Sequence, residues 1–79
     1  MDKTTEEIAQ DFIAMGHSET LITDIIAGNA MADNTAEDKQ DCVDRNVEHL
    51  VLMVAKDYWT DEDMTAVNSA ITAGNGYTA

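Results

Sequence analysis

The sequence predicts an all-α protein, a compact bundle of about four helices in which one helix is long and central. The chain has no proline and only four glycines among 79 residues, so it lacks the frequent turn residues of hairpin-rich proteins. Its apolar residues recur at spacings of three, four and seven, the period of a half-buried helix. Threonine followed three residues later by Glu or Asp, a pattern that opens helices, occurs at Thr4, Thr35 and Thr60.

Residues 1–79 are expected to form a single helical domain, because each half of so short a chain could not bury a core. Hydrophobic residues make up 44% of the chain, which is enough for a globular fold and too many for a disordered acidic tail. A domain of this size has a small stability margin and often gains stability by association. Self-association is therefore expected.

The first helix is predicted to begin after Thr4 and to end at Met15, with Gly16 as its left-handed stop. The run Met15-Gly16-His17-Ser18 resembles the Met-Gly-aromatic loop of ubiquitin-associated domains, with His17 in place of the aromatic residue. The resemblance implies a tight turn between two helices. The apolar stripe expected to face the core is Ile8, Phe12 and Met15.

A second, short helix is predicted from Ser18, which is a favourable N-cap residue with Glu19 in the first turn behind it. The sequence allows two positions for the end of this helix, Gly28-Asn29 or Asp33-Asn34. Its apolar residues at helical spacing are Leu21, Ile22, Ile25 and Ile26.

The third helix is predicted to be the longest, beginning after Thr35 and running to Tyr58 or Trp59. That span is about 23 residues, or about 35 Å along the helix axis. The apolar stripe that defines it is Val43, Val47, Leu50, Val51, Val54 and Tyr58.

The fourth helix is predicted to begin after Thr60, with Asp63 completing its cap, and to end at Gly74-Asn75-Gly76. Its expected core stripe is Met64, Val67 and Ile71.

Between Val47 and Ala55 the third helix is apolar on almost every side, and Leu52 and Met53 are expected to face away from the main stripe. A helix of this kind has to be buried on two sides. We interpret Leu52, Met53 and Trp59 as the self-association surface of a homo-oligomer. The alternative is a central core helix enclosed within a monomer.

The net charge of −12 comes from sixteen acidic residues against four basic ones, and it would repel nucleic acids and anionic lipid surfaces alike. We expect no direct nucleic-acid binding and no membrane association, but a basic host protein could be a partner. Asp41, Asp44 and Glu48 are the candidate face for it. The alternative function is therefore a DNA-mimic inhibitor that occupies the basic groove of a host nucleic-acid-binding protein.

No catalytic residue, metal ligand or cofactor is expected, because the chain has one cysteine, two histidines and no phosphate-binding loop. The protein is therefore predicted not to be an enzyme. The single Cys42 excludes an intramolecular disulfide and suits a reducing, cytoplasmic location. The longest nearly apolar run, residues 50–55, is far shorter than the roughly 20 residues that span a bilayer.

The C-terminal third, from residues 46–50 through 59–68, resembles small acidic helical proteins of marine cyanophages. The resemblance implies a phage protein in the cytoplasm of an infected host, either a virion component or a modulator of a host factor. The function predicted from the sequence is thus that of a small acidic interaction protein that associates with itself.

Overall fold

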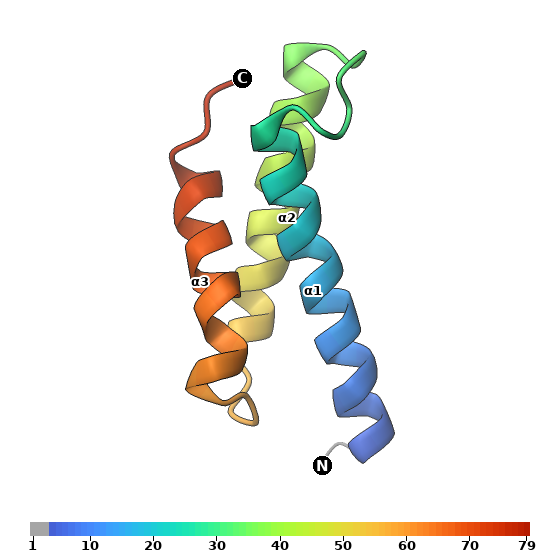
Figure 1. The fold of residues 1–79 in the computed structure, drawn as a ribbon. Helices are drawn as coiled ribbons and strands as arrows, with labels where there is room; N and C mark the ends of the chain where they lie inside the picture. The colour runs from blue at the N-terminus through green and yellow to red at the C-terminus, as the bar shows by residue number, and fades with distance from the viewer. Residues whose placement is uncertain (1–3) are drawn as a thin grey trace.

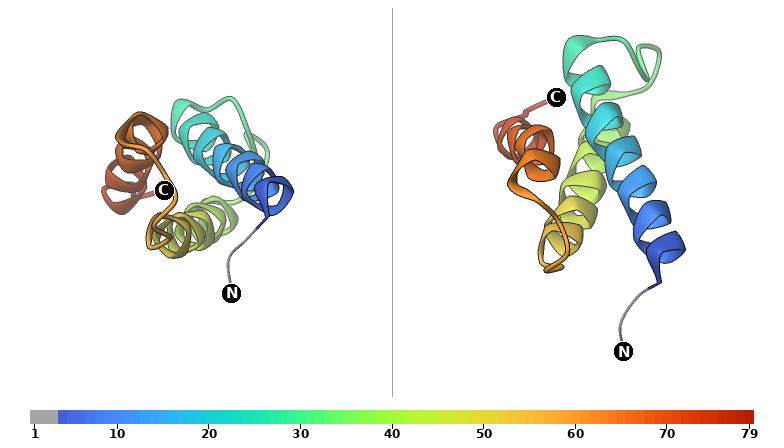
Figure 2. Two further views of the ribbon diagram at one scale, coloured as in Figure 1. Left: turned by 90° about the horizontal axis from the view of Figure 1, so that it is seen from below. Right: turned by 60° about the horizontal axis from the view of Figure 1, so that its bottom comes forward.

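The computed structural model describes residues 4–79 and contains three α-helices there, with no strand in that range: α1 (Thr5–Ala27), α2 (Ala36–Val54) and α3 (Asp61–Asn75) (Figure 1). The predicted all-α class is confirmed. The number of helices is three rather than about four. Viewed end-on, the helices occupy the corners of a triangle, and each packs against the other two (Figure 2, left).

Three of the four predicted helix starts are confirmed, and each has the same local cause; the fourth, at Ser18, is wrong, as is the tight turn expected before it, because Ser18 lies inside α1. The hydroxyl of Thr4 accepts a hydrogen bond from the backbone N–H of Glu7 at 3.2 Å. Thr35 and Thr60 accept equivalent bonds, each 3.1 Å long, from the residues three positions further on. These bonds satisfy backbone donors that have no partner inside a helix.

The predicted stop at Gly16 is wrong, because α1 continues through it to Ala27 as one helix. The buried residues on either side of Gly16 lie on one continuous stripe, and they are Met15, Ser18, Ile22 and Ile25. Burying that stripe outweighs the cost of one glycine inside a helix, about 1 kcal/mol. The left-handed glycine is Gly28, with φ of 83°, and it ends the helix.

The third predicted helix corresponds to α2, which ends at Val54 instead of Tyr58 or Trp59. The indole N–H of Trp59 turns back and donates to the carbonyl oxygen of Met53 at 2.8 Å. The same carbonyl accepts the backbone N–H of Lys56 at 3.1 Å, so two donors from the connection meet it and hold the chain reversal after α2. As a result α1, with 23 residues, is longer than α2, with 19, and the prediction of one long central helix is wrong.

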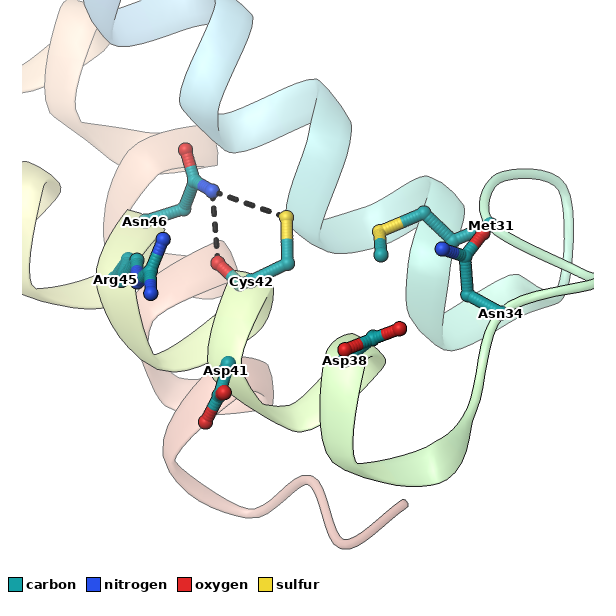
Figure 3. A pocket seen from close by; sticks show the side chains of 7 residues that line it. All are labelled: Met31, Asn34, Asp38, Asp41, Cys42, Arg45 and Asn46. Atoms are coloured by element: carbon teal, nitrogen blue, oxygen red, sulfur yellow. Dashed lines mark hydrogen bonds between the residues drawn. The ribbon is translucent and has the colours of Figure 1, made fainter.

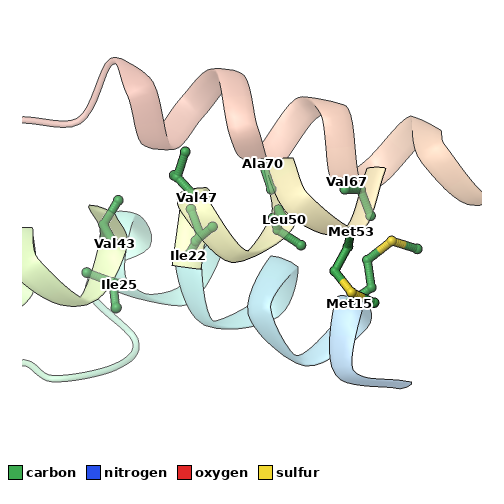
Figure 4. Packing of buried hydrophobic residues seen from close by; sticks show 9 residues of the cluster. All are labelled: Met15, Ile22, Ile25, Val43, Val47, Leu50, Met53, Val67 and Ala70. Atoms are coloured by element: carbon green, nitrogen blue, oxygen red, sulfur yellow. The ribbon is translucent and has the colours of Figure 1, made fainter. Parts of the chain in front are cut away.

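The core is a single cluster of apolar side chains from all three helices (Figure 4). Its buried members are Met15, Ile22, Ile25, Val43, Val47, Leu50, Met53, Val67 and Ala70. Gly74 lets α3 approach α2 closely, since a Cβ atom there would lie 2.3 Å from a methyl carbon of Val47. The chain end docks on α2, where the Gln40 side chain donates to the carbonyl of Tyr77 at 3.2 Å.

Toward its N-terminal end α1 diverges from α3, which is visible in Figure 1 and in the right view of Figure 2. The core therefore narrows at this end of the molecule. The connection between α2 and α3, residues 55–60, lies there as well. This arrangement leaves one side of the first turns of α1 without a helix packed against it.

Candidate functional site

Exposed apolar side chains gather on the N-terminal half of α1, where Phe12 is 48% exposed and Ile13 is 66% exposed. They border a surface hollow of about 450 Å³, which we call the aromatic groove. The α1 residues that line it are Thr5, Ile8, Ala9, Phe12 and Ile13. Tyr58 and Trp59 from the connection, and Asp63 from the first turn of α3, complete it.

Trp59 forms a fixed wall of the aromatic groove, because both its polar and its apolar parts have partners. Its indole N–H is bound to the carbonyl of Met53. Its ring lies 4.6 Å from the ring of Tyr58 and 6.1 Å from that of Phe12, centroid to centroid, and both pairs are tilted. These separations fall in the favourable range for aromatic pairs. The groove is therefore held in shape before any ligand binds.

Tyr58 ties the same connection to α1, since its hydroxyl donates a hydrogen bond to a carboxylate oxygen of Asp11 at 2.5 Å. This hydrogen bond, followed by partial burial and the negative charge of Asp11, raises the pKa of Tyr58 to about 12. The phenol therefore stays protonated, and can donate this hydrogen bond between the connection and α1, at pH values up to about 12, where a tyrosine of ordinary pKa has lost its proton.

A smaller hollow of about 120 Å³ continues the aromatic groove between α1 and α3. Phe12 and Asp63 line both hollows, and Glu19 lines the second one. The charged side chains in the two linings are thus the carboxylates of Glu19 and Asp63. The combined surface is apolar at its floor and negative at its edges.

The three residues predicted for self-association do not form one surface. Leu52 is 65% exposed, and its neighbour Val51 is 48% exposed. Met53 is only 8% exposed and belongs to the core, so the prediction that it faces away from the main stripe is wrong. The reason is the register of α2, in which Met53 follows Leu50 by three residues and lies on its side of the helix. Trp59 is half-buried in the aromatic groove.

The predicted acidic face is present on α2, where Asp41, Asp44 and Glu48 are all exposed and follow one another at spacings of three and four. It is not uniformly negative. Arg45 and Asp41 line a third hollow of about 390 Å³ near the start of α2 (Figure 3). A guanidinium group within this surface makes it a poorer imitation of a row of phosphates than the sequence indicates.

Sequence reasoning missed one pair, Ser18 and His49, whose Oγ and Nδ1 atoms lie 2.7 Å apart. The two residues are distant in the chain, and the antiparallel packing of α1 on α2 brings them together. A serine beside an imidazole is a nucleophile arrangement. Ser18, however, is only 6% exposed and lines none of the three hollows described above, so this bond serves to join α1 to α2.

Within residues 4–79, no group of three or more His, Cys, Asp or Glu side chains is arranged to hold a metal ion. The described helices also include none with the length and apolar character required to cross a bilayer.

Comparison of the chain with protein-family models, with curated proteins and with solved structures finds no match. The resemblance to proteins of marine cyanophages stays a prediction. The functional argument therefore depends on the chain's own surface.

Proposed function

We propose that this chain is a non-enzymatic interaction protein of the cytoplasm that binds a partner protein through the aromatic groove. The observation that carries the proposal is the exposure of Phe12 and Ile13 beside the fixed ring of Trp59. Exposed apolar side chains that cluster mark interaction sites, whereas single exposed ones do not. Aromatic side chains that are already held in place lose little conformational entropy on binding, which suits them to anchor an interface.

The groove runs beside a helix, and this shape favours a protein segment over a small molecule. Residues 5–13 of α1 extend over about 12 Å, a little more than two helical turns. A partner helix that lies along this face would meet Ile8 and Phe12, which are one turn apart, as a single apolar ridge. Ser18, the serine that lies beside a histidine, lines none of the three hollows.

A photo-crosslinking amino acid placed at position 13 tests the proposal in the cells that produce the protein. Position 52 is a matched control, because Ile13 and Leu52 have nearly equal exposure, 66% and 65%, and both lie within helices. We expect an adduct between position 13 and a partner protein, and no adduct with that protein from position 52. No adduct at position 13, or adducts with the same protein at both positions, would contradict a specific groove.

A second candidate function, self-association through α2, is favoured by the exposure of Val51 and Leu52. Leu52 is nine residues, or two and a half turns, from the buried Val43, so it points directly away from the core. Under this candidate, light scattering gives a multiple of the 8.6 kDa chain mass, and Leu52→Asp restores the monomer mass. A monomer mass for the unchanged protein would eliminate it.

A further inference from the structure

We infer that the occupant of the aromatic groove is a basic amphipathic helix of another protein, with apolar residues on one side and Lys or Arg at its flanks. This inference rests on the proposed function, because it names the chemistry of the partner that the groove would bind. It is carried by two properties of the same surface, the apolar floor and the sign of the charges around it.

The apolar floor requires apolar side chains from the partner. Ile8, Phe12 and Ile13 line it from α1, and Trp59 lines it from the connection. Apolar residues of a partner helix at positions i, i+3 or i+4, and i+7 would follow this floor for about two turns. A hydrophilic segment would cover the same surface without placing apolar side chains against it. Its binding would gain little free energy from apolar burial.

The charged side chains that line the aromatic groove and the smaller hollow beside it are negative, and the helix turns from which they come carry further carboxylates. Glu19 and Asp63 are part of the linings, and Glu6 is exposed in the first turn of α1. Asp61 and Glu62 are exposed in the first turn of α3, next to Asp63. Lys56 is the one basic residue in the connection. A partner with Lys or Arg beside its apolar residues would therefore meet complementary charge.

The same charges disfavour a second copy of this chain as the occupant. Each chain carries a net charge of −12, so two copies would bring carboxylates against carboxylates at the rim of the groove. Nucleic acids and anionic lipids would be repelled for the same reason. Of the occupants with enough apolar surface to fill the floor, a cationic helix is the one that the charges also favour.

The probe for this inference is a synthetic amphipathic peptide of about 18 residues, or five helical turns, with leucines on one face and lysines on the other. Trp59 reports binding by its fluorescence, since it is the only tryptophan of the chain and lies in the groove. Isothermal titration calorimetry gives the affinity independently. We expect binding at about 0.15 M salt that weakens as salt is raised.

Two control peptides separate charge from shape. The first has every lysine replaced by glutamate and keeps the apolar face, and we expect it not to bind. The second has the composition of the probe in an order that distributes the leucines around the helix, and we expect it to bind at least about tenfold more weakly. Equal binding of the glutamate peptide would show that the partner is not basic, while leaving the groove as a docking surface.

Two variants of the protein locate the site without changing its charge. Ile13→Ser removes an apolar side chain from the groove. It should lower the affinity for the lysine peptide by about tenfold or more, because burial of one isoleucine side chain contributes that much free energy to binding. Leu52→Ser removes an apolar side chain of nearly equal exposure from α2, outside the groove. It should leave the affinity for the lysine peptide within about twofold of the unchanged protein. Equal effects of the two variants, or no effect of Ile13→Ser, would overturn the inference in favour of unspecific charge attraction.

Failure of this inference can be distinguished from failure of the proposed function. If no peptide binds at about 1 mM while position 13 still crosslinks a protein, the basic helix is wrong and the groove remains an interaction surface. An adduct formed with a second copy of this chain would identify self-association at the groove. If position 13 yields no adduct and no peptide binds, both proposals fail.

Discussion

Phe12 and Trp59 show how a residue's role can depend on where a distant element begins. The spacing of Phe12 predicts a core position, yet the residue is 48% exposed. The reason is that α1 and α3 diverge at this end of the molecule, so Phe12 borders two hollows and its ring contact is with Trp59 of the connection. Neither the divergence nor the Phe12–Trp59 contact is encoded in local spacing, so of the residues in the candidate site only Trp59 was predicted from the sequence to be a site residue, and it was predicted for self-association.

The Tyr58–Asp11 hydrogen bond predicts a specific alkaline titration. The pKa of Tyr58 is raised from 10.0 to about 12 in the folded protein. Between these two values the unfolded chain loses the phenolic proton and the folded chain keeps it. The stabilising contribution of Tyr58 is therefore complete below pH 10 and is lost as the pH rises toward 12.

Ultraviolet absorbance of tyrosinate measures this pKa directly, in a Tyr77→Phe background that leaves Tyr58 as the only tyrosine. Asp11→Asn removes the negative charge and weakens the acceptor, so we expect the pKa of Tyr58 to fall toward 10. A pKa near 10 in the protein with Asp11 intact would mean that the hydrogen bond does not form in solution.

At the scale of the element, the three helix starts with a threonine cap could be predicted, and so could the end of α3 at Gly74-Asn75-Gly76, but the end of α2 and the continuity of α1 could not. Thr4, Thr35 and Thr60 bind backbone N–H groups three residues away, so the whole interaction lies within a few neighbouring residues. The end of α2 depends instead on the Trp59 indole reaching back to Met53. The continuation of α1 through Gly16 depends on packing against residues of α2 and α3.

Two glycine substitutions test these elements with opposite expected signs. A Cβ atom at Gly16 meets nothing within 4 Å, so Gly16→Ala should raise the free energy of unfolding by about 1 kcal/mol through helix propensity alone. A Cβ atom at Gly74 would overlap a methyl group of Val47, so Gly74→Ala should lower it by about 1 to 3 kcal/mol.

Chemical denaturation of both variants gives the two differences. Destabilisation by Gly16→Ala would indicate a left-handed glycine at this position, as the local sequence predicts, and would contradict a continuous α1. A neutral or stabilising Gly74→Ala would show that α2 and α3 do not approach closely at Val47.

At the scale of the whole molecule, the sequence predicted the all-α fold class but not the number and packing of the helices. Periodicity predicts helices wherever they occur, because amphipathic spacing is required by any core. The sequence did not distinguish a bundle of three helices from one of about four, since that difference depends on one glycine. The apolar character of residues 47–55 is explained only in part by burial within one chain: Val47, Leu50 and Met53 are buried and Val54 is half-buried, whereas Val51, Leu52 and Ala55 are exposed.

The net charge of −12 predicts that salt stabilises the fold. Raising NaCl from about 0.01 M to about 1 M shortens the screening length from about 30 Å to about 3 Å and reduces repulsion among the carboxylates. We expect the Tm at pH 7 to rise by several degrees and the rise to be smaller near pH 4, where carboxylates are partly protonated. A Tm that falls with salt at pH 7 would refute a fold limited by charge repulsion.

The groove exists only if α1 is one helix whose first turns stand beside Trp59. Nuclear magnetic resonance tests this most directly, through the Cα chemical shifts of residues 12–20 and the proton contacts between the rings of Phe12 and Trp59. The account predicts uninterrupted helical shifts through Gly16, His17 and Ser18, together with contacts between the two rings. A break in the helical shifts at Gly16 and no contact between the rings would contradict it.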